Sequence, residues 1–182
     1  MALHVGAGLK DIVRRQLTER AAATGERAAR PVTTVKSEAL FDLQFRATVE
    51  GHSFISDERE EGGGHDAGPA PLRYFLAGIM MCHQVWCVKS AAVADVKLDR
   101  LECEISGYVE PTIADSPAPS GFARAAYTVT VESPNSAEEV EKVVDQACRR
   151  CAAFVTFQRS ARIDVTLIHN GNTIGERAYG PG

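Results

Sequence analysis

The sequence lacks several features that would assign a function directly. No continuous apolar segment precedes a small-residue cleavage site at the N-terminus, so nothing there predicts a secretory signal. The five cysteines are odd in number, and without a signal they indicate a protein of the reducing cytoplasm rather than a disulfide scaffold. No internal repeat or low-complexity tract is visible. What is left is a globular chain of 182 residues, long enough to close a hydrophobic core without disulfides or metals.

An excess of positive charge is also missing. The net charge is -4 and the isoelectric point is near 5.7, so nucleic acid is not an expected partner. Residues 1–36 are the exception, with seven Lys and Arg against three Asp and Glu. Within them, apolar residues at helical spacing predict an amphipathic helix that packs on its own domain, on a partner subunit or, as a further alternative, on a membrane surface. These residues are Leu9, Ile12, Val13 and Leu17. We therefore expect a helix and connector over residues 1–30 and one domain over residues 31–182.

No metal or phosphate motif is complete. Cys148 and Cys151 have the two-residue gap of a zinc knuckle, but no second such pair supplies the remaining ligands. Both lie toward the end of a predicted helix, where the helix dipole disfavours the thiolate of a thioredoxin-type motif. The glycines of "GGGHDAG" are not followed by Gly-Lys-Ser/Thr, so they do not form a phosphate loop. They predict either a mobile loop or the border of a site, and we expect no metal and no cofactor.

The periodicity of the chain predicts an α+β fold. We expect two or three strands over residues 32–58 with a turn at Glu50-Gly51, a long buried helix over 72–92, and strands over 96–110, 122–132 and 161–171. Alternation turns Cys103 inward, where a packing role is the simplest interpretation. Ser136 and Glu139 form a capping box that opens another helix. Its apolar face is predicted to hold Val140, Val143, Val144, Ala147 and Cys151, with Cys148 at the edge.

The most hydrophobic segment, "GPAPLRYFLAGIMMCHQVWCVKSAA", approaches the length of a membrane span. Its Arg73, His83, Gln84 and Lys89 favour a helix buried in protein instead. It contains Cys82 and Cys87, and a buried free cysteine is usually inert.

The stretch "GGGHDAGPAPLRYFLAGIMMC" resembles the OsmC/Ohr family (osmotically inducible protein C and organic hydroperoxide resistance proteins), in its OsmC-like branch. In that family a loop with paired glycines leads into Gly-Pro-x-Pro and then into a buried helix with a cysteine eleven residues after the second proline. Pro71 and Cys82 have this spacing, and the resemblance extends over about residues 40 to 170. It implies two antiparallel sheets around long buried helices, in an intertwined homodimer with its sites at the subunit interface.

The resemblance also implies a thiol-dependent peroxidase with peroxiredoxin activity, which reduces organic hydroperoxides in defence against oxidative stress. Cys82 matches the attacking cysteine and Cys151 the second, resolving cysteine, with Cys148 as the alternative. An external dithiol would then reduce the disulfide, and no membrane is implied.

Two residues depart from the family pattern. Leu72 stands where the hydroperoxide-resistance branch has a glutamate that helps to hold a catalytic arginine, and Ala152 replaces a proline. Arg46 and Arg30 are candidates for that arginine, and a reactive Cys82 needs either an arginine or His83 beside it. The missing glutamate favours an alternative function, a non-enzymatic homodimer that binds a small lipophilic ligand in the same cleft.

Overall fold

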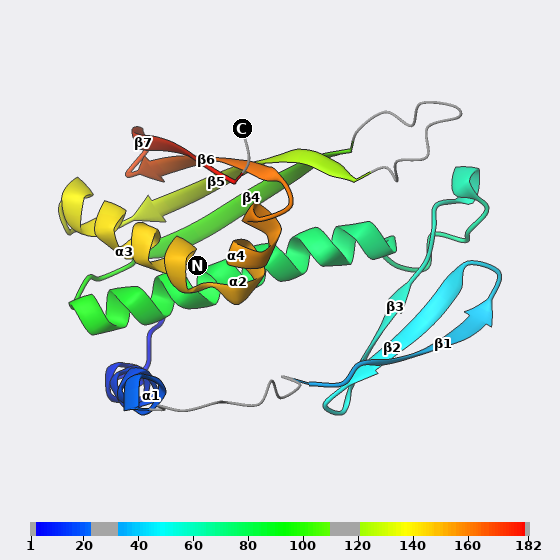
Figure 1. The fold of residues 1–182 in the computed structure, drawn as a ribbon, viewed down its shortest axis with the longest axis horizontal. Coiled ribbons are helices and arrows are strands. Elements are labelled where there is room, and N and C mark those ends of the chain that lie inside the picture. The colour runs from blue at the N-terminus through cyan, green and yellow to red at the C-terminus, as the bar shows by residue number, and fades with distance from the viewer. Residues whose placement is uncertain (1–2, 23–32, 110–120, 181–182) are drawn as a thin grey trace. The chain divides into compact units, whose positions relative to one another are not determined.

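A computed structural model describes residues 3–22, 33–109 and 121–180 (Figure 1). The chain divides into two compact units. The sheet–helix unit combines Met1–Arg20 with Leu76–Gly182, and the hairpin unit is Ala21–Phe75. The boundary expected at residue 30 lies outside the described residues.

The hairpin unit contains a three-stranded antiparallel sheet in the order β1–β2–β3. Its strands are β1 (Lys36–Phe41), β2 (Gln44–Val49) and β3 (His52–Ser56). Two-residue turns join them, and φ is positive at Asp42, Glu50 and Gly51, as tight hairpins of this length require. The predicted turn at Glu50-Gly51 is therefore confirmed, with three strands in this segment.

Specific contacts hold the glycine-rich loop after β3 in place. The loop also contains one turn of 3-10 helix (η1, Glu60–Gly62). The buried Asp57 accepts hydrogen bonds through Oδ2 from the backbone N–H groups of His65 and Ala67, at 3.2 and 3.3 Å. At Gly68 a Cβ atom would lie 2.3 Å from the carbonyl oxygen of Ile55, so only glycine fits there. Of the two alternatives for this loop, these contacts argue against a mobile one.

Helix α2 (Pro71–Ala94) follows the loop and begins at a proline, a residue that suits the first position of a helix because it has no N–H to leave unsatisfied. Its buried residues include Ile79, His83 and Cys87. Its other face leaves Met81 and Val85 56% and 52% exposed in the single chain. The helix predicted as buried is thus buried on one side only. By length and composition alone α2 could also cross a membrane, a property that core helices share.

The sheet–helix unit is built on a four-stranded sheet in the order β4–β5–β6–β7. Its strands are β4 (Arg100–Val109), β5 (Phe122–Glu132), β6 (Arg162–His169) and β7 (Asn172–Tyr179). Between β5 and β6 lie two helices, α3 (Ala137–Arg150) and α4 (Ala152–Gln158). The predicted capping box at Ser136 is confirmed, whereas α4 and β7 were not expected.

The expectation of two antiparallel sheets is correct for β1–β3 and wrong for one pair of strands here. β5 and β6 run parallel, with Tyr127 opposite Val165. The reason is the connection, because a helical crossover returns the chain to the end at which the previous strand began. The fold is α+β with two sheets, as predicted.

The core of this unit lies between the sheet and the helices α2, α3 and α4, which cover the same face of the sheet (Figure 1). Strict alternation in β5 and β6 turns every second side chain inward. The most deeply buried members are Cys87, Ala125, Tyr127, Val129, Val131, Val140, Ala147, Cys148, Cys151, Phe154 and Ile163. The register also confirms the inward face of β4, where Cys103 lies opposite Val129.

Helix α1 (Leu9–Ala22) packs on its own unit, which was the first of the alternatives for the N-terminal segment. Val13 is 1% exposed. Lys10 forms an ion pair with Asp95, just past the end of α2, and Lys89 of α2 donates to Gln16 at 3.3 Å.

Candidate functional site

Cys82 and Cys151 come together from separate elements of the sheet–helix unit. Cys82 lies on α2 and is half-buried, whereas Cys151 is fully buried. The two thiols are close enough for Cys82 to raise the pKa of Cys151. We call these two residues the outer thiol pair. The sequence predicted both residues, and the fold makes them neighbours.

The position of Cys151 differs from the prediction in one respect. It does not lie on the apolar face of α3 but at the break between α3 and α4, with extended backbone at φ -75° and ψ 109°. Its sulfur accepts a hydrogen bond from the backbone N–H of Phe154 at 3.4 Å and so caps α4. Burial nevertheless raises the pKa of Cys151 to about 12, because desolvation outweighs that hydrogen bond. Cys151 is therefore a neutral thiol at physiological pH.

His83 follows Cys82 in sequence but faces the core, because neighbours on a helix point about 100° apart. Its side chain is fully buried, and desolvation lowers its pKa to about 4. It is therefore uncharged at neutral pH. The expectation that His83 could supply a positive charge beside Cys82 is wrong.

Two further thiols meet at the His83 ring. Cys148, in the last turn of α3, has its sulfur 3.3 Å from His83 Nε2. Cys87, one turn along α2, has its sulfur 3.6 Å from Nδ1 and 3.9 Å from Nε2. We call Cys87 and Cys148 the inner thiol pair. Sequence reasoning considered Cys148 only as an alternative to Cys151, although the spacing of His83 and Cys87 by four residues places both on one helix face.

A tyrosine also contacts the His83 ring. The hydroxyl oxygen of Tyr127 lies 3.0 Å from His83 Nδ1. Burial raises the pKa of Cys103 to about 11, and its contact with Tyr127 lowers that pKa in part. Cys103 thus has a polar contact in addition to its predicted packing role.

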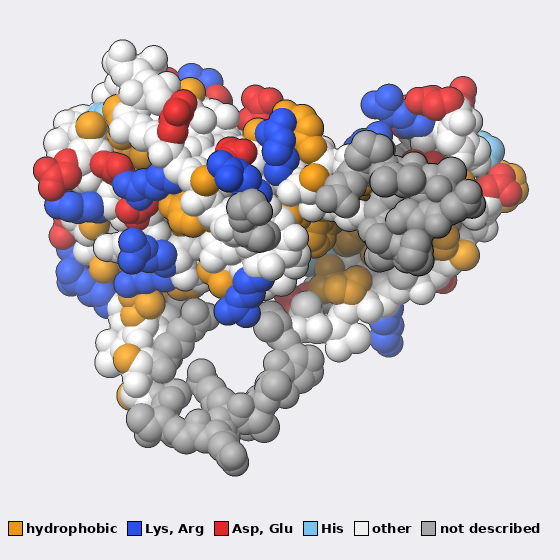
Figure 2. Space-filling model, turned by 45° about the horizontal axis from the view of Figure 1, so that its top comes forward, with side chains coloured by type: hydrophobic (Ala, Val, Ile, Leu, Met, Phe, Trp, Pro, Cys, Tyr) orange, Lys and Arg blue, Asp and Glu red, His pale blue; other side chains and the backbone are white. Residues whose placement is uncertain are grey.

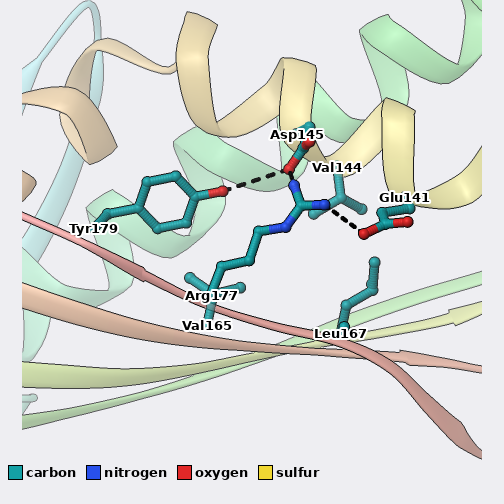
Figure 3. Close-up of a pocket in the computed structure, with 8 residues that line it drawn as sticks. Glu141, Val144, Asp145, Val165, Leu167, Arg177 and Tyr179 are labelled. Atoms are coloured by element: carbon teal, nitrogen blue, oxygen red, sulfur yellow. Dashed lines mark hydrogen bonds and ion pairs between the residues drawn. The ribbon is translucent and has the colours of Figure 1, made fainter.

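Tyr179 approaches the same thiol from β7. Contact between them lowers the pKa of Cys148 and raises that of Tyr179, and burial raises both pKa values further. Figure 3 shows the ring of Tyr179 pointing from the sheet toward α3, with its hydroxyl group also 3.5 Å from Asp145. Arg177 forms ion pairs with Asp145 and Glu141 and so fixes β7 against α3 (Figure 3).

The cavity between α3 and the sheet at this point is too small for an organic ligand. Its volume is about 10 Å³, about the space that one water molecule needs. Among residues 3–22, 33–109 and 121–180, no three His, Cys, Asp or Glu side chains are grouped to hold a metal ion.

The structure describes only one of the two candidates for the catalytic arginine. Arg30 lies outside the described residues. Arg46, on β2, forms an ion pair with Glu38 at 2.9 Å across the hairpin and is about half exposed. Leu72, at the position of the family glutamate, is also half exposed.

Comparison with known proteins gives a consistent family assignment. Residues 63–166, more than half of the chain, match the family described as OsmC-like protein. The hydroperoxide reductase of Mycoplasma genitalium is 29% identical over 108 residues, which cover 56% of this chain and 74% of that relative.

Solved structures show the same fold. An OsmC-like protein from Mycoplasma pneumoniae aligns with a TM-score of 0.67 at 21% identity, over 78% of this chain and all of the other. The organic hydroperoxide resistance protein OsmC of Legionella pneumophila aligns with a TM-score of 0.60 at 18% identity, over 78% and 98% of the two chains. Together with the sequence relative, these matches support a peroxide-related redox role.

Proposed function

Since the chain belongs to the OsmC-like protein family, we propose that it is a thiol-dependent peroxidase that reduces organic hydroperoxides through Cys82 and Cys151. The observation that carries this proposal is the proximity of these two thiols, which come from different elements. A nucleophilic and a resolving cysteine must lie this close for a disulfide to form without unfolding. The half-buried Cys82 is the more accessible of the two, so it is the one that meets the peroxide.

The reaction has two steps on the protein. The Cys82 thiolate attacks the distal oxygen of the hydroperoxide, the O–O bond breaks, and the alcohol leaves with a proton, so that Cys82 becomes a sulfenic acid. Cys151 then gives up its proton and attacks the Cys82 sulfur, and the sulfenic oxygen leaves as water. Because the pKa of Cys151 is about 12, its thiol stays protonated until Cys82 has been oxidised. An external dithiol, as the proposed reductant, returns both cysteines to thiols.

The functional form is proposed to be a homodimer in the reducing cytoplasm. Large apolar side chains that a single chain leaves exposed support this, because such patches mark interfaces. On α2 they are Met81 and Val85, and in the hairpin unit they are Leu40, Phe41, Leu43, Phe45 and Phe54. In Figure 2 hydrophobic side chains of this kind lie between acidic and basic ones on the visible face.

Replacement of the attacking thiol tests the function. Cys82→Ser should reduce hydroperoxide consumption to the uncatalysed background, because a serine hydroxyl has a far higher pKa than a thiol and is a poor nucleophile toward peroxide. Consumption is measured with an organic hydroperoxide and either a lipoyl-type dithiol or a monothiol as reductant. Cys103→Ser is the matched control, since it changes another cysteine of the same core and should retain activity.

The opposite result has a clear meaning. If wild type and Cys82→Ser consume hydroperoxide equally slowly with every reductant, the chain is not a peroxidase. Binding of a small lipophilic ligand would then be the function to test.

A further inference from the structure

We propose that the inner thiol pair, Cys87 and Cys148, is a second redox couple that reduces the Cys82–Cys151 disulfide within the chain. The inference rests on the proposed peroxidase function. It means that one reduced chain consumes two hydroperoxide molecules before it needs an external dithiol. The inner pair would act as an internal store of two electrons.

The first support is the position of the two inner sulfurs around one ring. They lie 3.3 and 3.9 Å from the same nitrogen atom, His83 Nε2. Both residues are 1% exposed, so no solvent or external thiol competes for them in the folded chain. Contact with the same nitrogen places the two sulfurs at one ring, and a disulfide forms when they move off the ring toward each other.

The second support is that the two pairs meet at Cys151. Cys148 is in the last turn of α3, and the backbone N–H of Cys151 still donates to Ala147 at 2.9 Å before the chain turns away. The extended ψ of Cys151 redirects only the residues that follow it, so Cys151 keeps its helical spacing from Cys148 at the end of α3. Both Cys82 and Cys148 are near enough to affect the pKa values in this pair of contacts, and a disulfide on Cys151 can be attacked from α3.

The third support is the environment of Cys148, which suits a nucleophile. His83 Nε2, 3.3 Å from its sulfur, is placed to take its proton, and contact with Tyr179 lowers the pKa of Cys148, which favours the thiolate. Burial acts in the opposite direction and raises the pKa of Cys148 to about 11. The exchange is therefore expected to be slower than the reaction of Cys82 and to accelerate as the pH rises.

A packing role alone does not account for this arrangement. An apolar side chain would fill the core at the position of His83 without the desolvation cost that lowers the pKa of the imidazole to about 4. The imidazole instead contacts both inner thiols and Tyr127.

The exchange balances without a further reactant. Cys148 loses its proton to His83 and attacks the Cys151 sulfur, which releases the Cys82 thiolate and forms a Cys148–Cys151 disulfide. Cys87 then attacks the Cys148 sulfur and its proton passes to the Cys151 sulfur, which leaves as a thiol, while the proton held by His83 is released and neutralises the Cys82 thiolate. The two electrons of Cys87 and Cys148 have passed to the outer pair. A second hydroperoxide then oxidises Cys82 and Cys151 again, and the chain holds two disulfides.

A titration without reductant tests the proposal. Fully reduced wild type is titrated anaerobically with tert-butyl hydroperoxide, and the remaining thiols are counted after unfolding in denaturant. We expect about two equivalents of peroxide to be consumed and the thiol count to fall from the five of the sequence to Cys103 alone. Cys148→Ser, which removes the attacking thiol of the exchange, should consume one equivalent, half as much. Cys103→Ser, the matched control, should still consume two.

Peptide mapping of oxidised wild type gives a result that does not depend on the folding of any variant. A Cys87–Cys148 crosslink is expected. One equivalent consumed with only a Cys82–Cys151 crosslink would overturn the internal couple and leave the peroxidase function standing. A second equivalent recovered as Cys82 sulfinic acid would also overturn it. No consumption at all would instead overturn the peroxidase function.

Discussion

At the scale of single residues, burial decides the protonation of the thiols and of the imidazole that joins them. Cys151, Cys148 and His83 all have pKa values shifted toward the neutral form, by desolvation in each case. The hydrogen bond from Phe154 and the contact with Tyr179 act the other way but are too weak to reverse the effect. These two buried thiols and the imidazole are therefore uncharged at neutral pH, and Cys82, the more accessible thiol, is the one proposed to react as a thiolate.

Removal of the resolving thiol should separate the two steps of the reaction. Cys151→Ser leaves Cys82 able to reduce one hydroperoxide, but the sulfenic acid then lacks its resolving neighbour. In excess peroxide we expect a single turnover followed by conversion of Cys82 to the sulfinic acid, measured as two added oxygen atoms by mass spectrometry. Recovery of unmodified, active Cys82 after several turnovers would contradict the role of Cys151.

His83 should make stability depend on pH. Its pKa is about 4 in the folded chain and near 6.5 when unfolded, so between these values only the unfolded chain binds the proton. The free energy of unfolding is therefore highest above about pH 6.5, where His83 is neutral in both states, and it decreases as the pH falls toward 4. The shift corresponds to a loss on the order of 3 kcal/mol in the free energy of unfolding. Urea denaturation at pH 7.5 and pH 4.5 measures it.

His83→Gln is the control for this measurement. Glutamine does not titrate, so the part of the pH dependence that comes from His83 should disappear. An unchanged pH dependence in this variant would show that other groups are responsible.

At the scale of elements, the conformation of the loop before α2 is determined by hydrogen bonds and close contacts of its backbone rather than by hydrophobic burial. Asp57 collects backbone N–H groups at its Oδ2, and Tyr74 of α2 donates to the Ile55 carbonyl oxygen at 2.7 Å. Both contacts connect β3, the loop and the first turn of α2 within the hairpin unit. The helix that bears Cys82 therefore starts at a fixed point.

Two glycines of this loop should respond differently to the same substitution. Gly68→Ala places a Cβ 2.3 Å from the Ile55 carbonyl oxygen, so the loop must move, at a cost of about 1–3 kcal/mol in the free energy of unfolding. Gly62→Ala is the matched control, since its nearest neighbour would be 3.7 Å away. Denaturant melts of the two variants test this, and equal stability of both would contradict the described packing of the loop.

At the scale of the whole molecule, a single chain leaves apolar surface that a soluble monomer would rarely expose. Met81 and Val85 are more than half exposed on the long apolar helix α2. Burial of such side chains contributes roughly 1.5–3 kcal/mol each. We propose that a second copy of the chain packs on these side chains and buries them.

A charge in this surface should therefore break the dimer. Wild type should have twice the 19.6 kDa mass of one chain by light scattering at micromolar concentration, and Val85→Glu should shift the mass toward one chain, because a carboxylate is not tolerated in an apolar interface. Ile12→Glu, which changes an exposed apolar residue of α1, should remain dimeric. A monomeric wild type would remove the support for the dimer.

The sequence by itself determined the local structure and the family. Periodicity located α2, β4 and β5, the capping box at Ser136 located α3, and the Pro71–Cys82 spacing identified the OsmC-like family, because each of these signals is a relation between residues close in the chain. Only the tertiary structure decided which side chains meet. The break at Cys151, the parallel β5–β6 pair and the ring of thiols around His83 depend on residues up to 65 positions apart. No local pattern encodes such contacts, since they follow from how the helices pack on the sheet.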